Sequence, residues 1–321
     1  MILSSNKIAK IININDFPDN NRKLHKEIVP LIGGVIVFLN ITLLFLIQIF
    51  LNDKLILLNE NIFTYREIYS FFITSFLLFI LGIYDDKYNI SPNQKLLLLS
   101  FIVYLSLTID PSLVLVEMRL SFYGEIILFK NADMIITIIC FLLFMNAYNM
   151  MDGIDLLAGL YAIIIFSYFI VNGIFFLTSI FMLFSLITFS YLNFNQKTFL
   201  GDSGTILVSY VISYIFVKYY NNETILYADS IIIIMLIPGL DLLRLAIERL
   251  VNRRNPFKPD RSHFHHLMQS IIKNRIICVS FIILVCIIPF LISIISTNLL
   301  AILISSIFYV FLVYLLKSYA K

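Results

Sequence analysis

Residues 276–296 read IICVSFIILVCIIPFLISIIS, a run of 21 residues without a charged side chain. An α-helix rises about 1.5 Å per residue, so about 20 apolar residues are enough to cross the hydrocarbon core of a bilayer. This run therefore predicts a transmembrane helix. Nine more stretches have a similar character, at 31–51, 68–84, 95–110, 134–148, 156–172, 174–192, 204–220, 227–249 and 298–317.

The composition of the whole chain agrees with this pattern. Of its 321 residues, 60% are hydrophobic and 13% are charged, whereas soluble domains average roughly 45–50% apolar and 25% charged residues. A water-soluble fold is therefore excluded. The sequence predicts an all-α polytopic membrane protein with about ten transmembrane helices, organised as one integral membrane domain over residues 1–321. A net charge of only +3 gives no sign of nucleic-acid binding.

The basic residues lie mainly on one side of the predicted membrane. If the N-terminus starts in the cytoplasm, 18 of the 23 Lys and Arg residues fall in cytoplasmic segments and five in outer connectors. Cytoplasmic loops carry an excess of Lys and Arg, so both termini are expected in the cytoplasm. One outer connector, 113–130, alternates apolar and polar residues around Tyr123-Gly124 and predicts a short extracytoplasmic hairpin.

Two adjacent acids, Asp85 and Asp86, follow the second apolar stretch directly. Charge at the edge of the hydrocarbon is costly, which suggests a functional site. Adjacent carboxylates suit a divalent cation or a polyphosphate-bound magnesium ion. The alternative is a solvated pair of acids that marks a helix end.

A polar stretch follows the fourth apolar stretch, where Asn146, Asn149, Asp152 and Asp155 recur at intervals of three residues. On a helix, this spacing places the four side chains on nearly one face. Alternatively, Asn149 and Asp152 end one helix and cap the next. Capping does not explain four such groups within ten residues at membrane depth, so a functional role is favoured.

Two further segments carry groups suited to anions. The sequence GDSG at 201–204 opens the seventh stretch, where two glycines let the backbone come close to a ligand. A simple helix cap at Asp202 is the alternative. Residues 253–266, RRNPFKPDRSHFHH, combine four Arg or Lys with three of the four histidines, and these donors suit phosphate oxygens. No cysteine or further acid completes a tetrahedral zinc site there.

Two other polar signals have simple structural explanations. His25 lies in a basic segment ahead of the first apolar stretch, where the positive-inside bias alone places Lys and Arg. Asp241 precedes Arg244 by three residues on the predicted eighth helix, which predicts an intrahelical ion pair. Under the predicted topology the acidic and basic motifs fall on the cytoplasmic face, and they describe one anion site with acids for a metal and bases for phosphate.

Five blocks follow one another along the chain: DFPDNNRKLH with PLIGG, DDKYNISPNQK, NAYNMMDGIDLLAG, FLGDSGT and PDRSHFHH. In their order and spacing they resemble the motifs of the polyprenyl-phosphate N-acetylhexosamine-1-phosphate transferases, glycosyltransferase family 4, over nearly the whole chain. The HFHH form and the Arg-Lys-x-His block are closer to the branch that uses a UDP-N-acetylhexosamine than to the branch that uses UDP-muramoyl pentapeptide.

The resemblance implies a multi-pass enzyme of the bacterial plasma membrane that transfers N-acetylhexosamine-1-phosphate from a UDP-sugar to polyprenyl (undecaprenyl) phosphate and initiates cell-envelope polysaccharide synthesis. It implies Mg²⁺ as the cofactor, with Mn²⁺ as an alternative ion, and allows a homodimer. The implied roles are catalytic for Asp85, Asp86, Asp152 and Asp155; metal-binding for Asp202 and Asn149; and substrate-binding for Arg261, His263, His265, His266, Asn146, Lys23 and His25.

Two departures from the family pattern define the alternatives. Family members usually carry another transmembrane helix before the Arg-Lys-x-His block, where this sequence has about twenty weakly apolar residues, and they usually have glycine where Leu156 stands. These departures favour a non-catalytic homologue, acting as an assembly partner, as the alternative. An ion-coupled transporter is disfavoured because the acids gather at one membrane face and no repeat is present. A CDP-alcohol phosphotransferase is disfavoured because Asp152-Gly153 is not followed by Ala-Arg.

Overall fold

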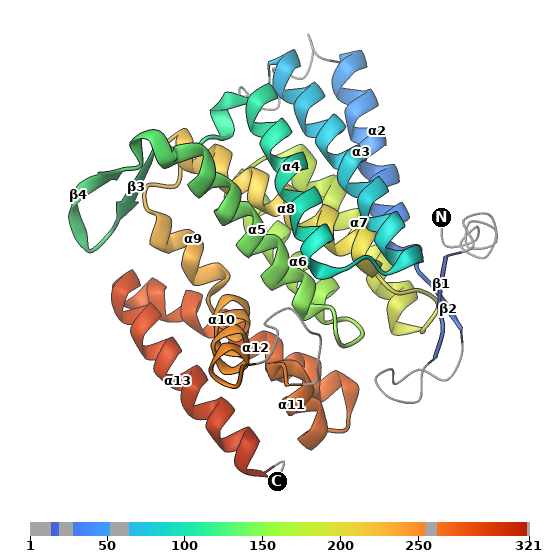
Figure 1. Cartoon of the computed structure of the whole chain (residues 1–321), viewed down its shortest axis with the longest axis vertical. Coiled ribbons are helices and arrows are strands. Elements are labelled where there is room, and N and C mark those ends of the chain that lie inside the picture. The colour runs from blue at the N-terminus through green and yellow to red at the C-terminus, as the bar shows by residue number, and fades with distance from the viewer. Residues whose placement is uncertain (1–13, 19–27, 52–63, 254–261, 320–321) are drawn as a thin grey trace. The chain divides into compact units, whose positions relative to one another are not determined.

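The computed structural model describes residues 14–18, 28–51, 64–253 and 262–319. The chain divides into two compact units: unit 1 comprises residues 1–112 and 158–215, and unit 2 comprises residues 113–157 and 216–321. Figure 1 shows the helices and strands of both units. The prediction of a single domain over residues 1–321 stays a prediction.

Unit 1 is a bundle of helices with a short strand pair at its start. Its elements are β1 (Asn15–Asp16), β2 (Val29–Pro30), α2 (Gly33–Leu51), α3 (Tyr65–Tyr88), α4 (Pro92–Ile109), α6 (Leu157–Val171), α7 (Phe176–Phe194) and α8 (Gly201–Asn221), of which α6 starts and α8 ends in unit 2. α2 packs on α3 and α7, and α3 on α4. Stacked rings join α2 to α3, with ring centroids 4.3 Å apart for Phe38 and Phe79.

The turn between α3 and α4 has strong local stop and start signals. Asn89 ends α3 in the left-handed conformation, with φ +50°. Ser91 then opens α4 with a capping box, in which its side chain accepts from Gln94 N and Gln94 reaches back to the backbone of Ser91. Pro92 suits the first turn of a helix because its missing N–H would be unpaired there anyway. This turn brings the start of α4 back beside the end of α3.

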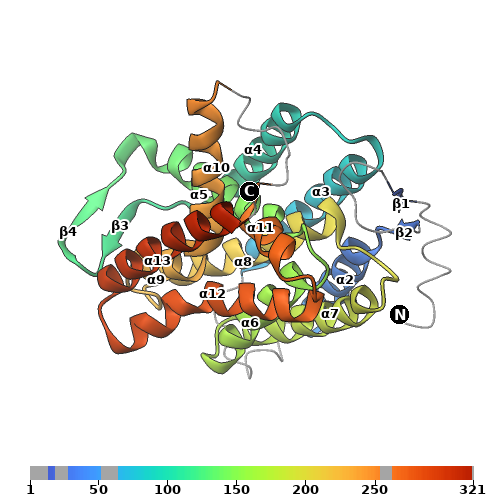
Figure 2. The ribbon, with the colours of Figure 1, turned by 90° about the horizontal axis from the view of Figure 1, so that it is seen from below.

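Unit 2 contains a hairpin and the remaining helices. Its elements are β3 (Glu117–Leu120), β4 (Tyr123–Leu128), the short 3-10 turns η3 (Pro111–Leu113, which begins in unit 1) and η4 (Lys130–Ala132), α5 (Asp133–Met151), α9 (Ala228–Ile234), α10 (Leu236–Val251), α11 (Phe264–Ile271), α12 (Arg275–Ile295) and α13 (Asn298–Tyr319). α12 and α13 pack side by side (Figure 2). α9 and α10 meet at an angle of 78°, and this break leaves Pro238 in the first turn of α10, where proline is tolerated.

The predicted hairpin is present, but its turn lies elsewhere. β3 and β4 pair antiparallel with Leu120 opposite Tyr123, so the turn is at Ser121 and Phe122 rather than at Tyr123-Gly124. The buried carboxylate of Asp229 accepts from Ser121 N (2.9 Å) and Ser121 Oγ (2.5 Å). These two bonds hold the turn and were not visible as a local sequence signal.

Each of the ten predicted apolar stretches contains a helix, but not all of these helices have the features of a span. Seven of the described helices are long and apolar enough to cross a membrane, or eight if the bent pair of α9 and α10 counts as one. α6 is shorter, and α8 is long but more polar, with every residue from Ser203 to Tyr220 buried. The chain is therefore an all-α polytopic membrane protein, and the count of ten crossings stays a prediction.

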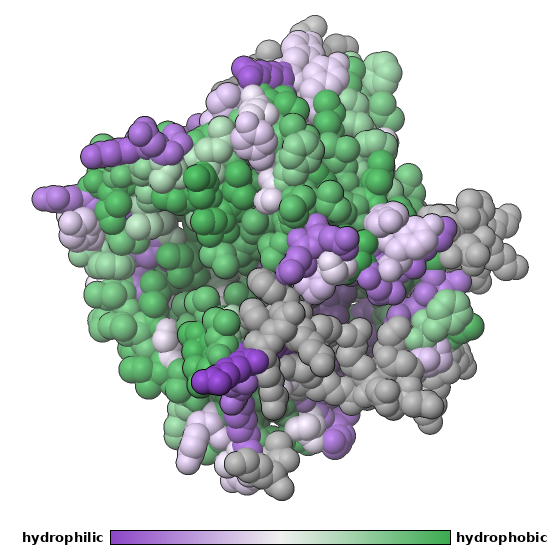
Figure 3. Space-filling view, viewed as in Figure 1, coloured by the Kyte–Doolittle hydropathy of each residue, from purple (hydrophilic) through white to green (hydrophobic). Residues whose placement is uncertain are grey.

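The outward faces of the helices are apolar, as expected for contact with lipid. Figure 3 shows apolar side chains over the visible face of α4. Leu97 and Phe101 on this helix are 67% and 55% exposed. Because soluble proteins rarely expose apolar patches of this extent, the surface supports a membrane location.

Candidate functional site

Glycines let the end of α3 and the start of α2 come into backbone contact with the start of α8. A Cβ atom added to Gly82 would lie 2.3 Å from Ser203 Cα, and one added to Gly34 would lie 2.6 Å from Gly204 N. Gly34 N also donates to the carbonyl oxygen of Leu200 at 3.1 Å. Only residues without a side chain permit such an approach. The PLIGG and GDSG motifs therefore meet in unit 1.

Asp86 caps α8 from a position 116 residues earlier in the chain. Its Oδ1 accepts from Asp202 N at 2.7 Å and its Oδ2 from Ser203 N at 3.1 Å. The first N–H groups of a helix have no intrahelical partner and favour a negative charge nearby. Gly201 has φ +71°, and a Cβ atom there would lie 2.8 Å from Asp86 Oδ2. The predicted catalytic Asp86 is thus engaged with the backbone of the GDSG segment.

Lys95 lies between the other two acids of unit 1. Its Nζ is 2.9 Å from Asp85 Oδ2 and forms a short hydrogen bond to Asp202 Oδ1. Asp85 Oδ1 also accepts from Ile90 N at 3.0 Å. The structure therefore joins Asp85, Asp86 and Asp202, which the sequence assigned to two separate motifs. Sequence reasoning missed Lys95, although a lone cation in the first turns of an apolar helix was an available signal.

This cluster suits a hard divalent cation bound in an open site, with few protein ligands, rather than one enclosed by protein ligands alone. Three carboxylates and one ammonium group leave two formal negative charges. Within the described ranges, no three His, Cys, Asp or Glu side chains gather as a metal-ligand set. Mg²⁺ typically takes one or two carboxylates together with waters and substrate phosphates. The oxygens of Asp202, whose side chain is 32% exposed, and of Asp85 fit such an open site. Asn149 belongs to unit 2, and its role as a metal ligand stays a prediction.

Only the first part of the polar stretch from Asn146 to Asp155 is helical. α5 ends at Met151, so only Asn146 and Asn149 lie on a shared helix face, and the expectation of one continuous helical face does not hold for Asp152 and Asp155. Asn146 donates to the Leu142 carbonyl of its own helix at 2.7 Å. Asp155 pairs with Arg275 of α12 at 2.8 Å, a partner that sequence reasoning missed because it is 120 residues away.

The turn after α5 shows why the family pattern has glycine where Leu156 stands. Leu156 has φ +74°, a left-handed conformation that is costly for a residue with a branched apolar side chain. A Cβ atom added to Gly153 in the same turn would lie 2.1 Å from His265 Nε2. The turn is thus shaped around the His265 ring, which brings the MDGID motif against the histidine motif within unit 2.

The three described histidines form a compact group at the start of α11. The His263 and His265 rings stack with centroids 5.5 Å apart, and the centroids of His265 and His266 are 4.2 Å apart. Burial above all, followed by the neighbouring His266 and His263, holds the pKa of His265 well below its usual value. Its Nε2 has no hydrogen-bond partner among the described residues. Lys23, His25 and Arg261 lie outside the described residues.

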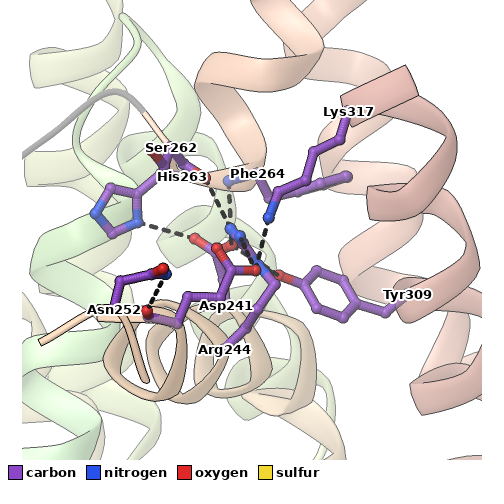
Figure 4. Close-up of polar contacts among 9 residues, drawn as sticks. Asp241, Arg244, Asn252, Ser262, His263, Phe264, Tyr309 and Lys317 are labelled. Atoms are coloured by element: carbon purple, nitrogen blue, oxygen red, sulfur yellow. Dashed lines mark hydrogen bonds and ion pairs between the residues drawn. The ribbon is translucent and has the colours of Figure 1, made fainter. Parts of the chain in front are cut away.

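Asp241 is the centre of a polar cluster that Figure 4 shows in close-up. The predicted ion pair is confirmed, with Arg244 Nη2 2.7 Å from Asp241 Oδ1. The same carboxylate also accepts from Tyr309 Oη at 2.7 Å and from Phe264 N at 3.1 Å, and its Oδ2 is 2.9 Å from His263 Nδ1. The explanation by an isolated intrahelical ion pair is therefore incomplete. Tyr309 was missed because nothing in the apolar sequence of α13 distinguishes it.

The chain is similar to known proteins over most of its length. Residues 68–220 match glycosyl transferase family 4. The chain is 30% identical over 278 residues to the undecaprenyl-phosphate alpha-N-acetylglucosaminyl 1-phosphate transferase of Thermotoga maritima, which covers 85% of this chain and 80% of that protein. It is 27% identical over 277 residues to the probable undecaprenyl-phosphate N-acetylglucosaminyl 1-phosphate transferase of Bacillus subtilis, which covers 82% and 72%.

A protein of Yersinia pestis with the same name as the Thermotoga maritima protein is also 27% identical over 277 residues, covering 82% of this chain and 71% of its own length. The chain therefore belongs to glycosyl transferase family 4, the polyprenyl-phosphate N-acetylhexosamine-1-phosphate transferases whose motifs it resembles.

Proposed function

We propose that this protein transfers N-acetylhexosamine-1-phosphate from a UDP-sugar to polyprenyl phosphate. In this reaction an oxygen of the lipid phosphate forms a bond to the β-phosphorus of the UDP-sugar. The bond from that phosphorus to the bridging oxygen breaks, and UMP leaves with the bond's electron pair. Polyprenyl-diphospho-N-acetylhexosamine is the lipid product. Membership of the family supports this proposal. The observation that carries it is the acid cluster, in which Lys95 joins Asp85 to Asp202 and Asp86 accepts from the backbone of Asp202.

The acids of unit 1 position groups rather than remove a proton. A phosphate monoester has a second pKa of about 6, so the lipid phosphate is largely a dianion at neutral pH and scarcely needs a general base. Both oxygens of Asp86 already accept backbone hydrogen bonds, and Asp85 is held by Lys95 and Ile90 N. Lys95 has the charge to hold a phosphate oxygen beside these acids. Charge stabilisation of this kind is usually the largest catalytic contribution.

Asp202 and Asp85 are the residues of this cluster that would hold Mg²⁺, with Mn²⁺ as an alternative. When bound, the ion neutralises the charge on phosphate oxygens and stabilises the leaving UMP. Asn149 is proposed as a further ligand. The other proposed roles concern unit 2 and the basic segments. Asp152 and Asp155 contact the nucleotide or sugar, and the substrate-binding residues are Asn146, His263, His265, His266, Arg261, Lys23 and His25.

The membrane arrangement belongs to the same proposal. Ten crossings, both termini in the cytoplasm and a cytoplasmic active site agree with the placement of 18 of 23 basic residues. We place the protein in the bacterial plasma membrane, where the UDP-sugar and the lipid carrier are both accessible, and allow for a homodimer.

The test is transfer of radiolabel from UDP-[¹⁴C]GlcNAc into extractable lipid by the purified full chain with polyprenyl phosphate, in Mg²⁺ or EDTA. Asp202→Ala is expected to lose at least about 100-fold in kcat/KM, since one preorganised charged contact is typically worth that much. Asp133→Ala is the matched control, because Asp133 begins α5 and so lies at the opposite end of that helix from Asn149. Folded wild type without label, for GlcNAc and for other UDP-N-acetylhexosamines, would favour the non-catalytic homologue.

A further inference from the structure

The Asp241 carboxylate contacts the histidine segment, residues 262–266, in addition to its ion pair with Arg244. Its Oδ1 accepts from Arg244 Nη2, Tyr309 Oη and Phe264 N, at 2.7, 2.7 and 3.1 Å. Its Oδ2 is left for His263 Nδ1 at 2.9 Å. Asp241 is 7% exposed and His263 is also 7% exposed. With four donors around its two oxygens, this buried carboxylate has its hydrogen-bonding capacity satisfied within the cluster.

Three contacts fix the start of α11 against α10, two of them from the Asp241 carboxylate and one from Arg244. Phe264 is the first residue of α11, and its N–H would be unpaired without Asp241. Arg244 Nη2 also donates to the Ser262 carbonyl at 2.8 Å. With the His263 ring itself, residues 262–264 are thus tied to α10 at three consecutive positions. The sequence separations of 18 to 23 residues exclude a purely local origin.

A carboxylate beside a histidine determines which ring nitrogen carries the proton. An ionised carboxylate can only accept, so His263 Nδ1 must donate to Asp241 Oδ2. The second nitrogen, Nε2, is then the ring atom left for another partner, and Figure 4 shows it pointing away from the cluster. In metal and acid–base sites, such carboxylate partners commonly fix the tautomer and orientation of a working histidine.

We propose that Asp241 is a positioning residue that keeps the proton of His263 on Nδ1 and so presents the lone pair of Nε2, a hydrogen-bond acceptor, to a hydroxyl or amide N–H group of the sugar nucleotide. The inference rests on the proposed function for the identity of that ligand, whereas the position of the proton does not depend on it. Asp241 acts through His263 and does not itself touch substrate. Arg244 and Tyr309 hold the carboxylate so that Oδ2 faces the ring.

Asp241→Asn tests this role with little change in shape. The amide oxygen is expected to stay with the three donors that now meet Oδ1. The amide nitrogen then faces His263 and donates to Nδ1, which moves the ring proton to Nε2. Glu248→Gln is the matched control, because Glu248 contacts Arg244 (3.1 Å) and Lys317 (2.6 Å) in the same cluster but not His263.

The first measurement is the ring-nitrogen NMR spectrum of the full chain labelled with ¹⁵N-histidine, at about pH 8. The chain has four histidines, so the spectrum is simple, and His263→Gln assigns the relevant signal. Wild type and Glu248→Gln are expected to show His263 protonated on Nδ1, and Asp241→Asn is expected to show it protonated on Nε2. An unchanged tautomer in Asp241→Asn would overturn the proposal.

The second measurement is a double-mutant cycle on transfer from the UDP-sugar. Asp241→Asn is expected to lower kcat/KM by about 10- to 100-fold, the usual range for outer partners of a working histidine. In the His263→Gln background the same change is expected to cost less than about twofold, because a residue that acts through His263 has nothing left to position. Equal losses in both backgrounds would show a merely structural role. If wild type transfers nothing, the proposed function fails while the NMR result still decides the proton position.

Discussion

At the scale of single residues, the acids at the ends of the apolar helices each have several partners. Asp85 and Asp202 share Lys95, and Asp86 accepts from the first N–H groups of α8. Asp241 has four donors in unit 2. Breaking a buried charge pair by removing one partner typically costs about 3–5 kcal/mol, whereas the intact pair contributes much less. Such groups therefore respond strongly to single substitutions.

Lys95→Met removes the cation between Asp85 and Asp202. We expect a lower midpoint of thermal unfolding in detergent and a loss of transfer activity of at least about 10-fold, because two carboxylates lose a charge-assisted hydrogen bond. Lys95→Met combined with Asp202→Asn should regain much of the stability, since one of the repelling charges is gone, but none of the activity. If the double variant is no more stable than Lys95→Met, the charge argument is wrong.

His265 is expected to make the folding stability fall as the pH is lowered. Its pKa is depressed in the folded chain, mainly by burial, so the unfolded chain takes up a proton first as the pH falls. Folding stability is then present above about pH 6.5 and is lost below it, by up to about 1.4 kcal/mol per pH unit. Unfolding midpoints between about pH 7.5 and 5 should fall more steeply for wild type than for His265→Gln. His266→Gln should reduce the slope only in part, because burial, the largest cause of the lowered pKa of His265, remains when the neighbouring His266 is removed.

Leu156 carries backbone strain that depends on the shape of its side chain. Leucine and isoleucine have the same number of apolar atoms, but a β-branched residue is less compatible with positive φ. Leu156→Ile is therefore expected to lower the free energy of unfolding by about 1–2 kcal/mol, the scale of left-handed strain. Leu156→Gly should not show this loss in thermal unfolding. Equal stability of the isoleucine and wild-type proteins would contradict the strain.

At the scale of elements, the decisive feature is the contact of α2 and α3 with the start of α8. Local signals place each helix: the capping boxes at Thr64 and Ser91 start α3 and α4, and the left-handed Asn89 ends α3. None of them specifies which helix ends meet. The glycines do so, because they alone permit contact at backbone distance.

Gly82→Ala tests this contact directly. The added methyl group would meet Ser203 Cα at 2.3 Å, and because both atoms belong to helices, neither can move alone. We expect a loss of about 1–3 kcal/mol, the usual cost of overpacking, together with loss of transfer activity as Asp86 leaves the start of α8. Gly239→Ala, with no atom within 4 Å of the added methyl group, should retain stability. Similar thermal midpoints for both variants would refute the close contact.

At the scale of the whole molecule, the testable property is its orientation in the membrane. In a chain whose Cys140, Cys278 and Cys286 are replaced by alanine, Gly124→Cys in the hairpin should react with a membrane-impermeant thiol reagent in intact cells. Lys197→Cys, between α7 and α8, should react only after the membrane is opened. The reverse pattern would invert the proposed topology and place the acid cluster outside the cytoplasm.

The sequence by itself determined the class of the protein, its helices and its family, because apolar length, charge placement and short motifs are local properties of the chain. It also selected Asp85, Asp86, Asp152, Asp155 and Asp202 as candidate site residues. Only the tertiary structure decided that Asp86 caps α8, that Lys95 joins two motifs, and that Asp241 binds the histidine segment. These contacts span up to 117 residues, and no local pattern encodes which distant donor will meet a buried acceptor; packing decides it, by bringing the helix ends together.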